Sequence, residues 1–366
     1  MNILVFTQSR AATNTVRPEL EIYLALARRG HHLTVAMEAD TEYGRIFREQ
    51  GVEVIDLKPE HKVCPKSIRV LRRELRKRPY DILYSTNSKV IPSAAFAAIG
   101  FATRFVTYRG TTGGLYRHDP SAYLTHLNPR VDGIVCVSDA VREDVLRRVW
   151  RHRERVVRIY KGHDLAWYDQ SPADLGQFGI GEDAFVVICA VNARPSKGIP
   201  VLLEAANRWA DHARLHLLMI GRNHEQYAPL VAQNLMRDRI HMAGFRADAP
   251  ELIVASDLLV QPSISGEGLP RAVMEAMGYG TPSVVTTTGG SKEVVQTGVN
   301  GIVVPTNDPA AIAAAVTDLY HHPDRIAEMS RQCREAIATR YSLEETARQY
   351  EAYFQALVHG LPTPAD

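Results

Sequence analysis

Cysteine is scarce in this 366-residue chain, and its four thiols (Cys64, Cys136, Cys189 and Cys333) show no metal-ligand spacing. The scarcity argues against a disulfide-dense secreted scaffold and against a cysteine-bound zinc site. Cys136 and Cys189 stand inside apolar, strand-like runs. We therefore expect reduced core thiols in a cytoplasmic protein.

Long hydrophobic runs are also missing. The longest weakly polar stretch, Val90 to Ala102, is too short to cross a bilayer. The apolar run that begins at Ile3 follows no basic segment, so we expect no signal peptide. Low-complexity segments are absent. A composition of 45% hydrophobic and 23% charged residues is that of a soluble globular protein.

The chain is long for one core and suits two domains of about 170 residues each. Strand-like runs alternate with helical ones throughout, which predicts parallel sheets covered by helices, an α/β fold with two Rossmann-like halves. Expected strands cover 3–7, 33–37, 52–57, 82–85, 105–108, 134–137 and 156–160, then 185–191, 215–220, 240–243, 258–261, 283–286 and 302–304. The periodicity breaks across 162–183, the expected linker, and we expect helices that open at Pro18, Pro309 and Pro323.

The net charge of +2 hides an asymmetry between the two halves. Up to Tyr168 there are 28 lysines and arginines against 18 acids, and the remainder has 15 against 23. The basic excess is concentrated in residues 62–78 and 147–158. In the first patch, Ile68, Leu71 and Leu75 have the spacing of a helical apolar stripe. The patches are either solvated faces, with this stripe buried in the core, or a surface for an acidic membrane or an anionic acceptor. Nucleic acid is not expected, because the patches lack interleaved aromatic residues and a known binding motif.

The most informative segment runs from Ser265 to Glu275, with a glycine-rich turn between Glu267 and Glu275. We expect Pro270 at the first position of a helix. The backbone N–H has no partner within the helix there, so a proline costs no hydrogen bond. The turn then offers N–H groups and the positive end of a helix dipole to an anion. A phosphate held there, with a carboxylate on each side to accept hydroxyl hydrogen bonds, would suit a sugar nucleotide.

The run from Ser265 through Gly280-Thr281-Pro282 to the Gly289–Glu293 segment resembles the retaining glycosyltransferases of family 4, which have the GT-B fold. The resemblance implies two Rossmann-like domains that face a central cleft. Residues 1–165 would form the acceptor domain and 166–340 the nucleotide-sugar donor domain, with a helix in 341–366 that packs back on the first domain. It also implies that Glu267 holds hydroxyls of the donor sugar and Glu275 those of the ribose.

A second constellation, Asn192 to Gly198, directly follows an expected strand. Arg194 and Lys197 at the carboxyl end of a strand can neutralise a diphosphate, since arginine offers a planar fork and lysine a compact charge. The segment resembles the family's Gly-Arg-x-x-x-x-Lys-Gly element, shortened and with Asn192 where glycine is usual. The same resemblance implies that Gly221 lies beside the nucleotide and that the segment containing Phe245 lies where the base packs. The donor-binding set expected is Gly221, Phe245, Glu267, Gly268, Leu269, Pro270 and Glu275.

The N-terminal half departs from the family pattern. The first loop, residues 8–15, lacks the usual Gly-Gly pair, and Arg109 stands where many relatives carry a histidine. Arg10, Arg109 and His118 are the acceptor-side candidates. A permanently charged Arg109 suits a carboxylate or phosphate; the alternatives are that it pairs with a local acid and shapes its loop, and that His118 is a solvent-exposed loop histidine. The turn 160–164 matches the family's Asn-Gly-x-Asp only in its glycine and aspartate.

The expected chemistry follows from a leaving nucleoside diphosphate whose charge grows as the glycosidic bond breaks. Arg194, Lys197 and the N–H groups near 268–271 would stabilise that charge. The expected catalytic set consists of Arg194, Lys197, Glu267 and Arg109. No Asp-x-Asp motif stands at a strand end, so we expect no metal and no cofactor apart from the donor.

The predicted function is a metal-independent, retaining transfer from a nucleoside-diphosphate sugar, UDP ahead of GDP. The acceptor would be an anionic glycolipid or polysaccharide at the cytoplasmic face of a membrane, in lipopolysaccharide or polysaccharide biosynthesis. Two alternatives stay open within the fold: a small soluble acceptor, or a sugar-nucleotide epimerase. A further alternative is a non-catalytic nucleotide-sugar binding protein. The intact set of Arg194, Lys197, Glu267 and Glu275 favours an enzyme.

Overall fold

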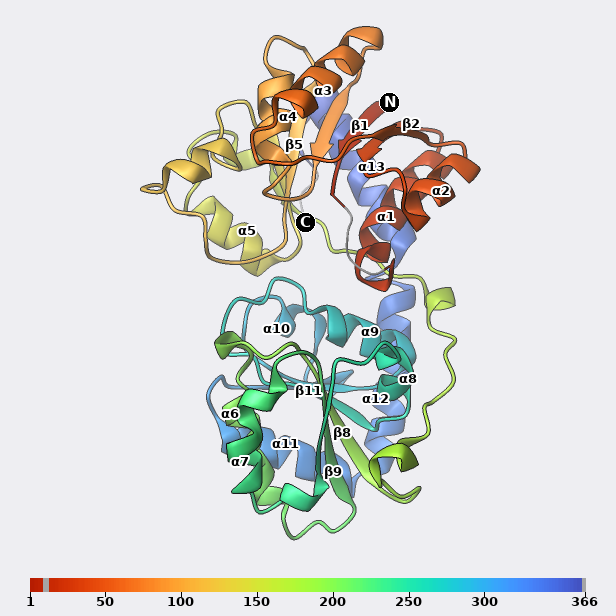
Figure 1. Ribbon diagram of the computed structural model, residues 1–366, viewed down its shortest axis with the longest axis vertical. Helices are drawn as coiled ribbons and strands as arrows, with labels where there is room; N and C mark the ends of the chain where they lie inside the picture. Colours follow the sequence, from red (N-terminus) through yellow and green to blue (C-terminus); the bar gives the residue numbers. More distant parts are fainter. Residues whose placement is uncertain (9–12, 364–366) are drawn as a thin grey trace. The chain divides into compact units, whose positions relative to one another are not determined.

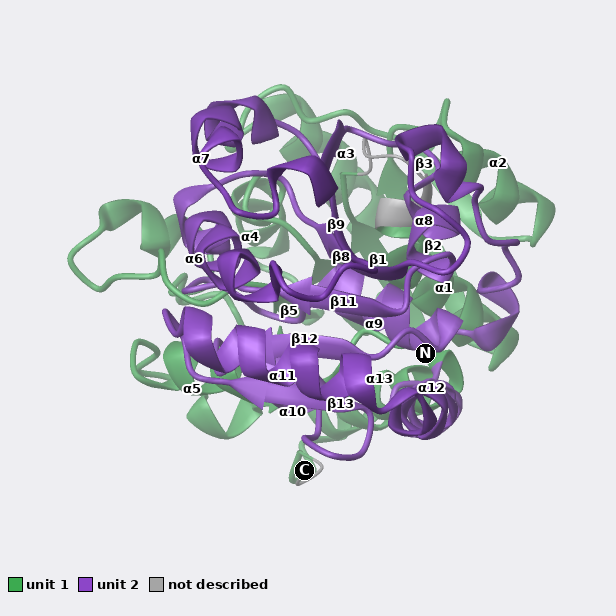
Figure 2. Ribbon diagram, turned by 90° about the horizontal axis from the view of Figure 1, so that it is seen from below, with its two compact units in different colours: residues 1–162, 343–366 green, residues 163–342 purple. Residues whose placement is uncertain are grey.

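The computed structural model describes residues 1–8 and 13–363 (Figure 1). The chain divides into two compact units (Figure 2). Unit 1 consists of Met1–Gly162 and Leu343–Asp366, and unit 2 of His163–Ser342. The chain passes from one unit to the other twice, after Gly162 and after Ser342.

Unit 1 contains a seven-stranded sheet in the order β3-β2-β1-β4-β5-β6-β7, and its pairs are parallel. Its strands are β1 (Asn2–Phe6), β2 (His32–Met37), β3 (Glu53–Asp56), β4 (Ile82–Ser85), β5 (Arg104–Arg109), β6 (Gly133–Cys136) and β7 (Val156–Arg158). The α-helices are α1 (Thr13–Arg28), α2 (Glu42–Glu49), α3 (Pro65–Lys77), α4 (Ile91–Ala98), α5 (Asp139–Leu146) and α13 (Leu343–His359).

Unit 2 contains a six-stranded sheet in the order β10-β9-β8-β11-β12-β13, also with parallel pairs. Its strands are β8 (Phe185–Ala190), β9 (Leu215–Ile220), β10 (Ile240–Gly244), β11 (Leu258–Gln261), β12 (Ser283–Thr286) and β13 (Gly301–Val304). The α-helices are α6 (Ile199–Ala206), α7 (Ala228–Ala232), α8 (Ala249–Val254), α9 (Arg271–Tyr279), α10 (Ser291–Val294), α11 (Pro309–His321) and α12 (Pro323–Ala338).

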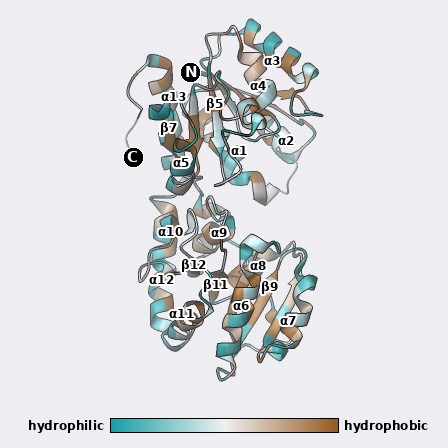
Figure 3. Ribbon diagram, turned by 90° about the vertical axis from the view of Figure 1, so that its left-hand side faces the viewer, coloured by the Kyte–Doolittle hydropathy of each residue, from teal (hydrophilic) through white to brown (hydrophobic). Residues whose placement is uncertain are grey.

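The prediction of an α/β fold with two Rossmann-like parallel sheets is confirmed, and each expected strand run coincides with a strand. The inner strands are buried, as short, nearly continuous apolar runs suit a parallel sheet that is covered on both faces, whereas the edge strands β3 and β10 are partly exposed. Figure 3 shows the hydrophobic colouring around β9 and β11. In unit 2 the fully buried Trp209 packs in this core, and its indole N–H donates to the Ala313 carbonyl at 3.3 Å.

Two expected helix starts were wrong. Pro18 lies inside α1, which begins at Thr13, because a proline near the amino end of a helix removes a single hydrogen bond without ending it. Gly30 ends this helix as expected, with a φ of +87°. Pro270 is the residue before α9 rather than its first member, with extended backbone angles (φ −74°, ψ 107°).

The segment 163–183, expected as a linker, is irregular and packs on unit 2. The Tyr168 ring meets the Tyr279 ring edge-on, with centroids 4.8 Å apart, and the Ala173 N–H donates to the Glu251 carbonyl at 3.0 Å. The last helix, α13, packs against α1 in unit 1. Its Thr346 hydroxyl donates to the Tyr160 carbonyl at 3.0 Å.

The four cysteines are buried free thiols, as expected for Cys136 and Cys189. Burial raises the pKa of Cys189 to about 12, which keeps this thiol protonated and unreactive. Within the described part of the chain, no helix is both long enough and apolar enough to span a membrane.

Candidate functional site

The site in unit 2 is built at the carboxyl edge of its sheet. β8 and β11 are neighbours, but β9 lies beyond β8 on one side and β12 beyond β11 on the other. This arrangement is a topological switch point, where the loops that follow the two central strands diverge and leave a crevice. The loop after β8 carries Arg194 and Lys197, and the loop after β11 carries Glu267.

The structure brings Lys197 and Glu267 together across this switch point. The Lys197 ammonium forms an ion pair with the Glu267 carboxylate, and the Ser263 hydroxyl donates to the same carboxylate oxygen at 2.6 Å. Glu267 is 6% exposed. The two loops are also joined through the backbone, because the Ile264 N–H donates to the Ser196 carbonyl at 2.8 Å. A fixed ammonium therefore stands at the crevice beside a nearly buried carboxylate.

Two glycines allow this close approach of backbone segments. Gly198 has a φ of +65°, and a Cβ at this position would lie 2.0 Å from the Pro262 carbonyl oxygen. Gly289 has a φ of +47°, and its Cβ would lie 1.9 Å from the carbonyl oxygen of Glu267. Both positions exclude a side chain on conformational and on steric grounds.

We expect Gly289→Ala to displace Glu267 and weaken binding at the site. Gly298→Ala is the matched control, because Gly298 has a φ of +81° but nothing within 4 Å of a Cβ. Both variants bear the conformational cost of about 1 kcal/mol for alanine at positive φ, and only Gly289→Ala adds a backbone clash. Thermal unfolding and UDP titration should show a larger loss for Gly289→Ala. Equal losses for the two variants would contradict the steric role.

Arg194 is exposed, and within the described residues its guanidinium has no hydrogen-bond or ion-pair partner. Its loop is anchored by Asn192, the residue that departs from the family pattern. The Asn192 side-chain oxygen accepts from the Arg222 N–H at 2.9 Å, and the Ala193 N–H donates to the Arg222 carbonyl at 2.8 Å. Asparagine thus ties the loop after β8 to the loop after β9, a contact that glycine could not make.

The loops after β9 and β10 place an aromatic ring and a second arginine at the same sheet edge. Gly221 follows β9, and its N–H donates to the Gly244 carbonyl at 2.7 Å. Phe245 is 62% exposed, and the Arg222 guanidinium lies 4.6 Å from its ring centroid. An exposed ring covered by a guanidinium can stack with a planar base. That Phe245 lies where the base packs stays a prediction.

The segment Gly268–Pro270 leads directly into α9, and Glu275 lies within that helix. No side chain caps the start of α9, so its first N–H groups remain available to an anion. Burial raises the pKa of Glu275, opposed by the Arg271 guanidinium, whose Nε lies 3.4 Å from the carboxylate. Glu275 therefore takes up a proton more readily than an exposed glutamate.

The acceptor-side candidates Arg109 and His118 lie in unit 1. Arg10 falls outside the described residues. The Arg109 guanidinium donates to the carbonyls of Thr111, at 3.1 Å, and Gly113, and burial lowers the pKa of this side chain. His118 is exposed and stacks on Tyr116, with ring centroids 5.3 Å apart. Arg109 thus shapes its own loop, though through backbone carbonyls rather than through an acid.

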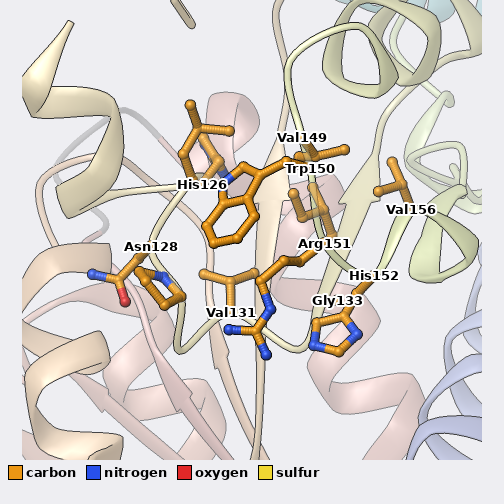
Figure 4. A pocket seen from close by; sticks show the side chains of 12 residues that line it. His126, Asn128, Val131, Gly133, Val149, Trp150, Arg151, His152 and Val156 are labelled. Atoms are coloured by element: carbon orange, nitrogen blue, oxygen red, sulfur yellow. The ribbon is translucent and has the colours of Figure 1, made fainter. Parts of the chain in front are cut away.

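A hollow in unit 1 lies at the amino edge of the unit-1 sheet (Figure 4). It is lined by residues that precede β6 and β7, among them His126, Trp150 and Arg151. Burial, and secondarily the Arg109 charge, lowers the pKa of His126 to about 3, so its ring is neutral and unsuited to acid–base chemistry. Within residues 1–8 and 13–363, no group of three or more potential ligands could hold a metal ion.

Comparison with known families accounts for both units. The family "Glycosyl transferases group 1" matches residues 170–340, and the family "Glycosyltransferase Family 4" matches residues 20–167. The chain belongs to the GT-B glycosyltransferases of group 1. The Lys197–Glu267 cluster of this family member lies within the first match, and Arg109 within the second.

The chain is similar to proteins that are named as glycosyltransferases, among them WcaL, named a putative colanic acid biosynthesis glycosyltransferase. WcaL of Salmonella typhimurium is 29% identical over 182 residues, a match that covers 47% of this chain but less than half (45%) of WcaL. The UDP-Gal:alpha-D-GlcNAc-diphosphoundecaprenol alpha-1,3-galactosyltransferase of Escherichia coli is 25% identical over 304 residues, 76% of each chain. The crystal structure of Anabaena HepE in complex with UDP superimposes with a TM-score of 0.77 at 22% identity, covering 97% of this chain and 100% of HepE, which shows a shared fold.

Three residues that organise the unit-2 site were not predicted from the sequence. Ser263 orients Glu267, Arg222 covers Phe245, and His224 donates from Nε2 to the Val191 carbonyl at 2.7 Å. Arg222 could have been found, since it directly follows the expected nucleotide glycine. Ser263 could also have been found, since it lies four residues before Glu267 on the same loop. The partner of His224, Val191, lies after another strand, so no local pattern in the sequence indicates that contact.

Proposed function

We propose that this protein transfers a glycosyl residue from a nucleoside-diphosphate sugar to an acceptor hydroxyl, with retention of anomeric configuration and without a metal ion. Family membership supports the transferase class. The observation that carries the proposal is the Lys197–Glu267 pair at the switch point of the unit-2 sheet. A cation beside a carboxylate at this point suits a diphosphate and a sugar ring, which supports the proposal.

The cationic side chains act on the leaving group. As the bond between the anomeric carbon and the diphosphate oxygen breaks, negative charge grows on that oxygen. Lys197, held in place by Glu267, and the exposed Arg194 are positioned to stabilise this charge. Their charge takes the place that a divalent ion would otherwise fill. This electrostatic effect is larger in the transition state than in the bound donor, which is the condition for catalysis.

Retention follows from attack on the same face from which the diphosphate departs. The acceptor oxygen forms a bond to the anomeric carbon, and its proton passes to the departing phosphate oxygen. This route needs no enzyme nucleophile. The Glu267 carboxylate already accepts hydrogen bonds from Lys197 and Ser263, which suits a role in orienting sugar hydroxyls rather than in attack.

UDP is the nucleotide that we propose, ahead of GDP. HepE was crystallised with UDP, and the E. coli relative is named for UDP-Gal. In this chain the exposed Phe245 under Arg222 offers one stacking face to the base, and Glu275 offers a carboxylate to the ribose hydroxyls. The pyrimidine would thus be held by the loop after β10 and the ribose by helix α9.

The function is tested by incubating the pure protein with UDP-glucose, UDP-galactose, UDP-N-acetylglucosamine and GDP-mannose in the presence of chelator. We expect slow hydrolysis of one donor, since transferases of this kind pass sugar to water when no acceptor is present. NMR of the first product should show the same anomeric configuration as the donor. Nucleotide binding without any turnover would indicate a binding protein. A strict need for magnesium or manganese would overturn the metal-free mechanism.

UDP affinity should depend on pH through Glu275. Because burial raises the pKa of Glu275, its ionised form, which accepts the ribose hydrogen bonds, is lost at a higher pH than for an exposed glutamate. Affinity should therefore be full at neutral pH and fall as the pH is lowered through this raised pKa. Glu275→Gln should weaken binding about tenfold at neutral pH. In calorimetry the variant should also lose the part of the pH dependence that Glu275 causes; an unchanged pH profile would contradict the assignment.

The acceptor that we propose is an anionic glycolipid or polysaccharide, reached at an acidic membrane surface. The E. coli relative's name specifies a diphosphoundecaprenol-linked acceptor. On α3 of unit 1, the exposed Lys66, Arg69 and Arg73 have no ion-pair partner within the described residues. Nearby in unit 1, Phe96 and Ile99 are 38% and 53% exposed. A cationic face with exposed apolar side chains suits an acidic lipid surface.

The second basic run, 147–158, contributes much less free charge. Its arginines bond within unit 1: Arg148 donates to the Leu115 carbonyl at 3.1 Å, Arg153 donates to the Leu146 carbonyl, and Arg158 lies 3.5 Å from Asp139. Arg151 has only the Trp150 ring as a partner among described residues, at 5.7 Å from its centroid. We therefore assign the membrane contact to α3.

Charge reversal on α3 should reduce liposome binding. We expect Lys66→Glu, Arg69→Glu and Arg73→Glu together to lower co-sedimentation with vesicles containing acidic lipid by about tenfold or more, since each cation near such a surface is worth about 1 kcal/mol. Binding of the unaltered protein should fall steeply between 0.05 M and 0.5 M salt, because salt screens the attraction.

The control variant reverses three exposed arginines of unit 2, Arg208, Arg237 and Arg331, and carries the same change in net charge. This control should keep most of the binding of the unaltered protein. Equal loss in both triple variants would show that only net charge matters. Absence of binding at low salt would remove the membrane contact altogether.

A further inference from the structure

The carboxyl edge of the unit-1 sheet has its own switch point, between β1 and β4. These strands are neighbours, while β2 lies beyond β1 and β5 beyond β4. Thr7 follows β1 and Thr86 follows β4, and their hydroxyl oxygens are 2.8 Å apart. In an open parallel sheet this is the place where a ligand crevice forms. Arg109 and His118, the acceptor-side candidates within the described residues, belong instead to β5 and the loop that follows it.

Two charged side chains reach the switch point from distant parts of unit 1. Glu19 comes from α1, and Lys161 follows β7 in the turn that departs from the family pattern. The Lys161 ammonium lies 3.0 Å from Glu19 Oε2. The other carboxylate oxygen, Oε1, accepts from the Thr7 hydroxyl at 3.0 Å and from the Tyr23 hydroxyl at 3.1 Å. Three side chains thus fix the orientation of one carboxylate.

The Glu19–Lys161 pair is ionised and remains partly exposed. Burial is the strongest influence and would raise the pKa of Glu19, but the Lys161 charge and the hydrogen bonds from Lys161, Thr86 and Thr7 together outweigh it, so the pKa is lowered. The side chains of Glu19 and Lys161 keep 21% and 26% of their surface exposed. By contrast, the neighbouring Tyr84–Tyr350 hydroxyl pair is fully internal. An oriented carboxylate that retains an open side can accept further hydrogen bonds from outside the fold.

We propose that Glu19 and Lys161 form an acceptor-binding subsite, in which Glu19 accepts a hydrogen bond from a hydroxyl of the acceptor sugar. The proposal rests on the proposed glycosyl transfer and deepens it. A carboxylate that is already paired with a cation offers no attraction to an anionic group, so this subsite takes a neutral, polyhydroxylated ring. Lys161 is a positioning residue that keeps Glu19 ionised and turned toward the switch point.

The variants are Glu19→Gln, Lys161→Met and Lys161→Arg, with Glu21→Gln as the matched control. Glu21 lies on the same helix, is partly exposed, and accepts from the Tyr43 hydroxyl at 3.3 Å. The probes are methyl α-glucoside, methyl α-galactoside and N-acetylglucosamine, titrated into the intact, UDP-loaded protein by saturation-transfer NMR. UDP affinity of each variant is measured separately by calorimetry.

We expect Glu19→Gln to weaken binding of the best glycoside probe by about ten- to a hundredfold, the range for a hydrogen bond to a charged group. Its UDP affinity should stay within twofold. Lys161→Met should weaken the glycoside similarly, and Lys161→Arg should restore most of the binding, which a purely structural loss would not allow. Glu21→Gln should leave both affinities unchanged. If Glu19→Gln does not fold, the contrast between Lys161→Met and Lys161→Arg decides.

Equal glycoside affinity in Glu19→Gln and the unaltered protein would overturn the subsite, as would the failure of all three probes to bind the unaltered, UDP-loaded protein. Failure of the unaltered protein to bind any nucleoside diphosphate would instead overturn the proposed function. The two failures are distinguished because UDP binding is measured in the absence of a glycoside.

Discussion

Lys197→Ala is expected to lower the turnover of the donor by on the order of 100-fold or more, with a smaller change in UDP affinity. The Lys197 ammonium is fixed by the nearly buried Glu267 at the switch point of the unit-2 sheet. A preorganised charge of this kind acts most strongly on the charge that develops in the transition state; removing one comparable donor costs about 10²–10³ in turnover. The affinity for UDP should fall less than turnover, because water and Arg194 still solvate the diphosphate in the ground state.

Single-turnover kinetics with the UDP-sugar, together with UDP calorimetry, separate these two effects. The exposed Arg208 provides a control, since Arg208→Ala removes a cation from unit 2 away from the sheet edge that carries the site. A Lys197→Ala variant whose affinity and turnover fall by the same factor would mean that Lys197 contributes uniform binding. Turnover equal to that of Arg208→Ala would remove Lys197 from the mechanism.

Glu267→Ala is expected to be at least as severe as Lys197→Ala. The variant removes the carboxylate proposed to hold sugar hydroxyls, and it leaves the Lys197 ammonium and the Ser263 hydroxyl without their shared partner. Because the three side chains act as one unit, their losses should not add. The double variant Lys197→Ala, Glu267→Ala should therefore be no slower than the slower single variant, within about threefold.

Donor turnover is measured for both single variants and the double variant, with thermal unfolding in parallel. Glu267→Gln keeps the shape and the Ser263 hydrogen bond, so it should recover stability but little turnover. Additive losses in the double variant would show that Lys197 and Glu267 act independently. Full recovery by Glu267→Gln would show that the negative charge is dispensable.

The fold could be predicted from the sequence because its signals are local. The short apolar runs that became β1 to β13 are separated by turn residues and helical runs, and their burial on both faces indicates a parallel sheet. Helix starts were less predictable. A proline is compatible with several positions near the start of a helix, so Pro18 and Pro270 alone do not fix the residue at which α1 and α9 begin.

The site was predictable only as far as it follows strand ends. Lys197 and Glu267 could be assigned to one edge from the order of the strands, but their ion pair depends on backbone contacts such as Ile264 to Ser196. The partners of Arg109 were not predictable, since any of several acids or carbonyls could have satisfied a guanidinium. The run 147–158 illustrates the same limit: its charge is visible in the sequence, and its internal partners are not.

The central claim is that the carboxyl edge of the unit-2 sheet holds the nucleoside diphosphate. Hydrogen–deuterium exchange of the intact protein with and without saturating UDP tests this claim most directly. We expect slower exchange in the peptides that contain residues 193–198 and 266–275, and little change on α3. Glu275→Ala should need a higher UDP concentration to show the same protection. UDP-dependent protection that is absent from 193–198 and 266–275 and appears elsewhere would contradict the account.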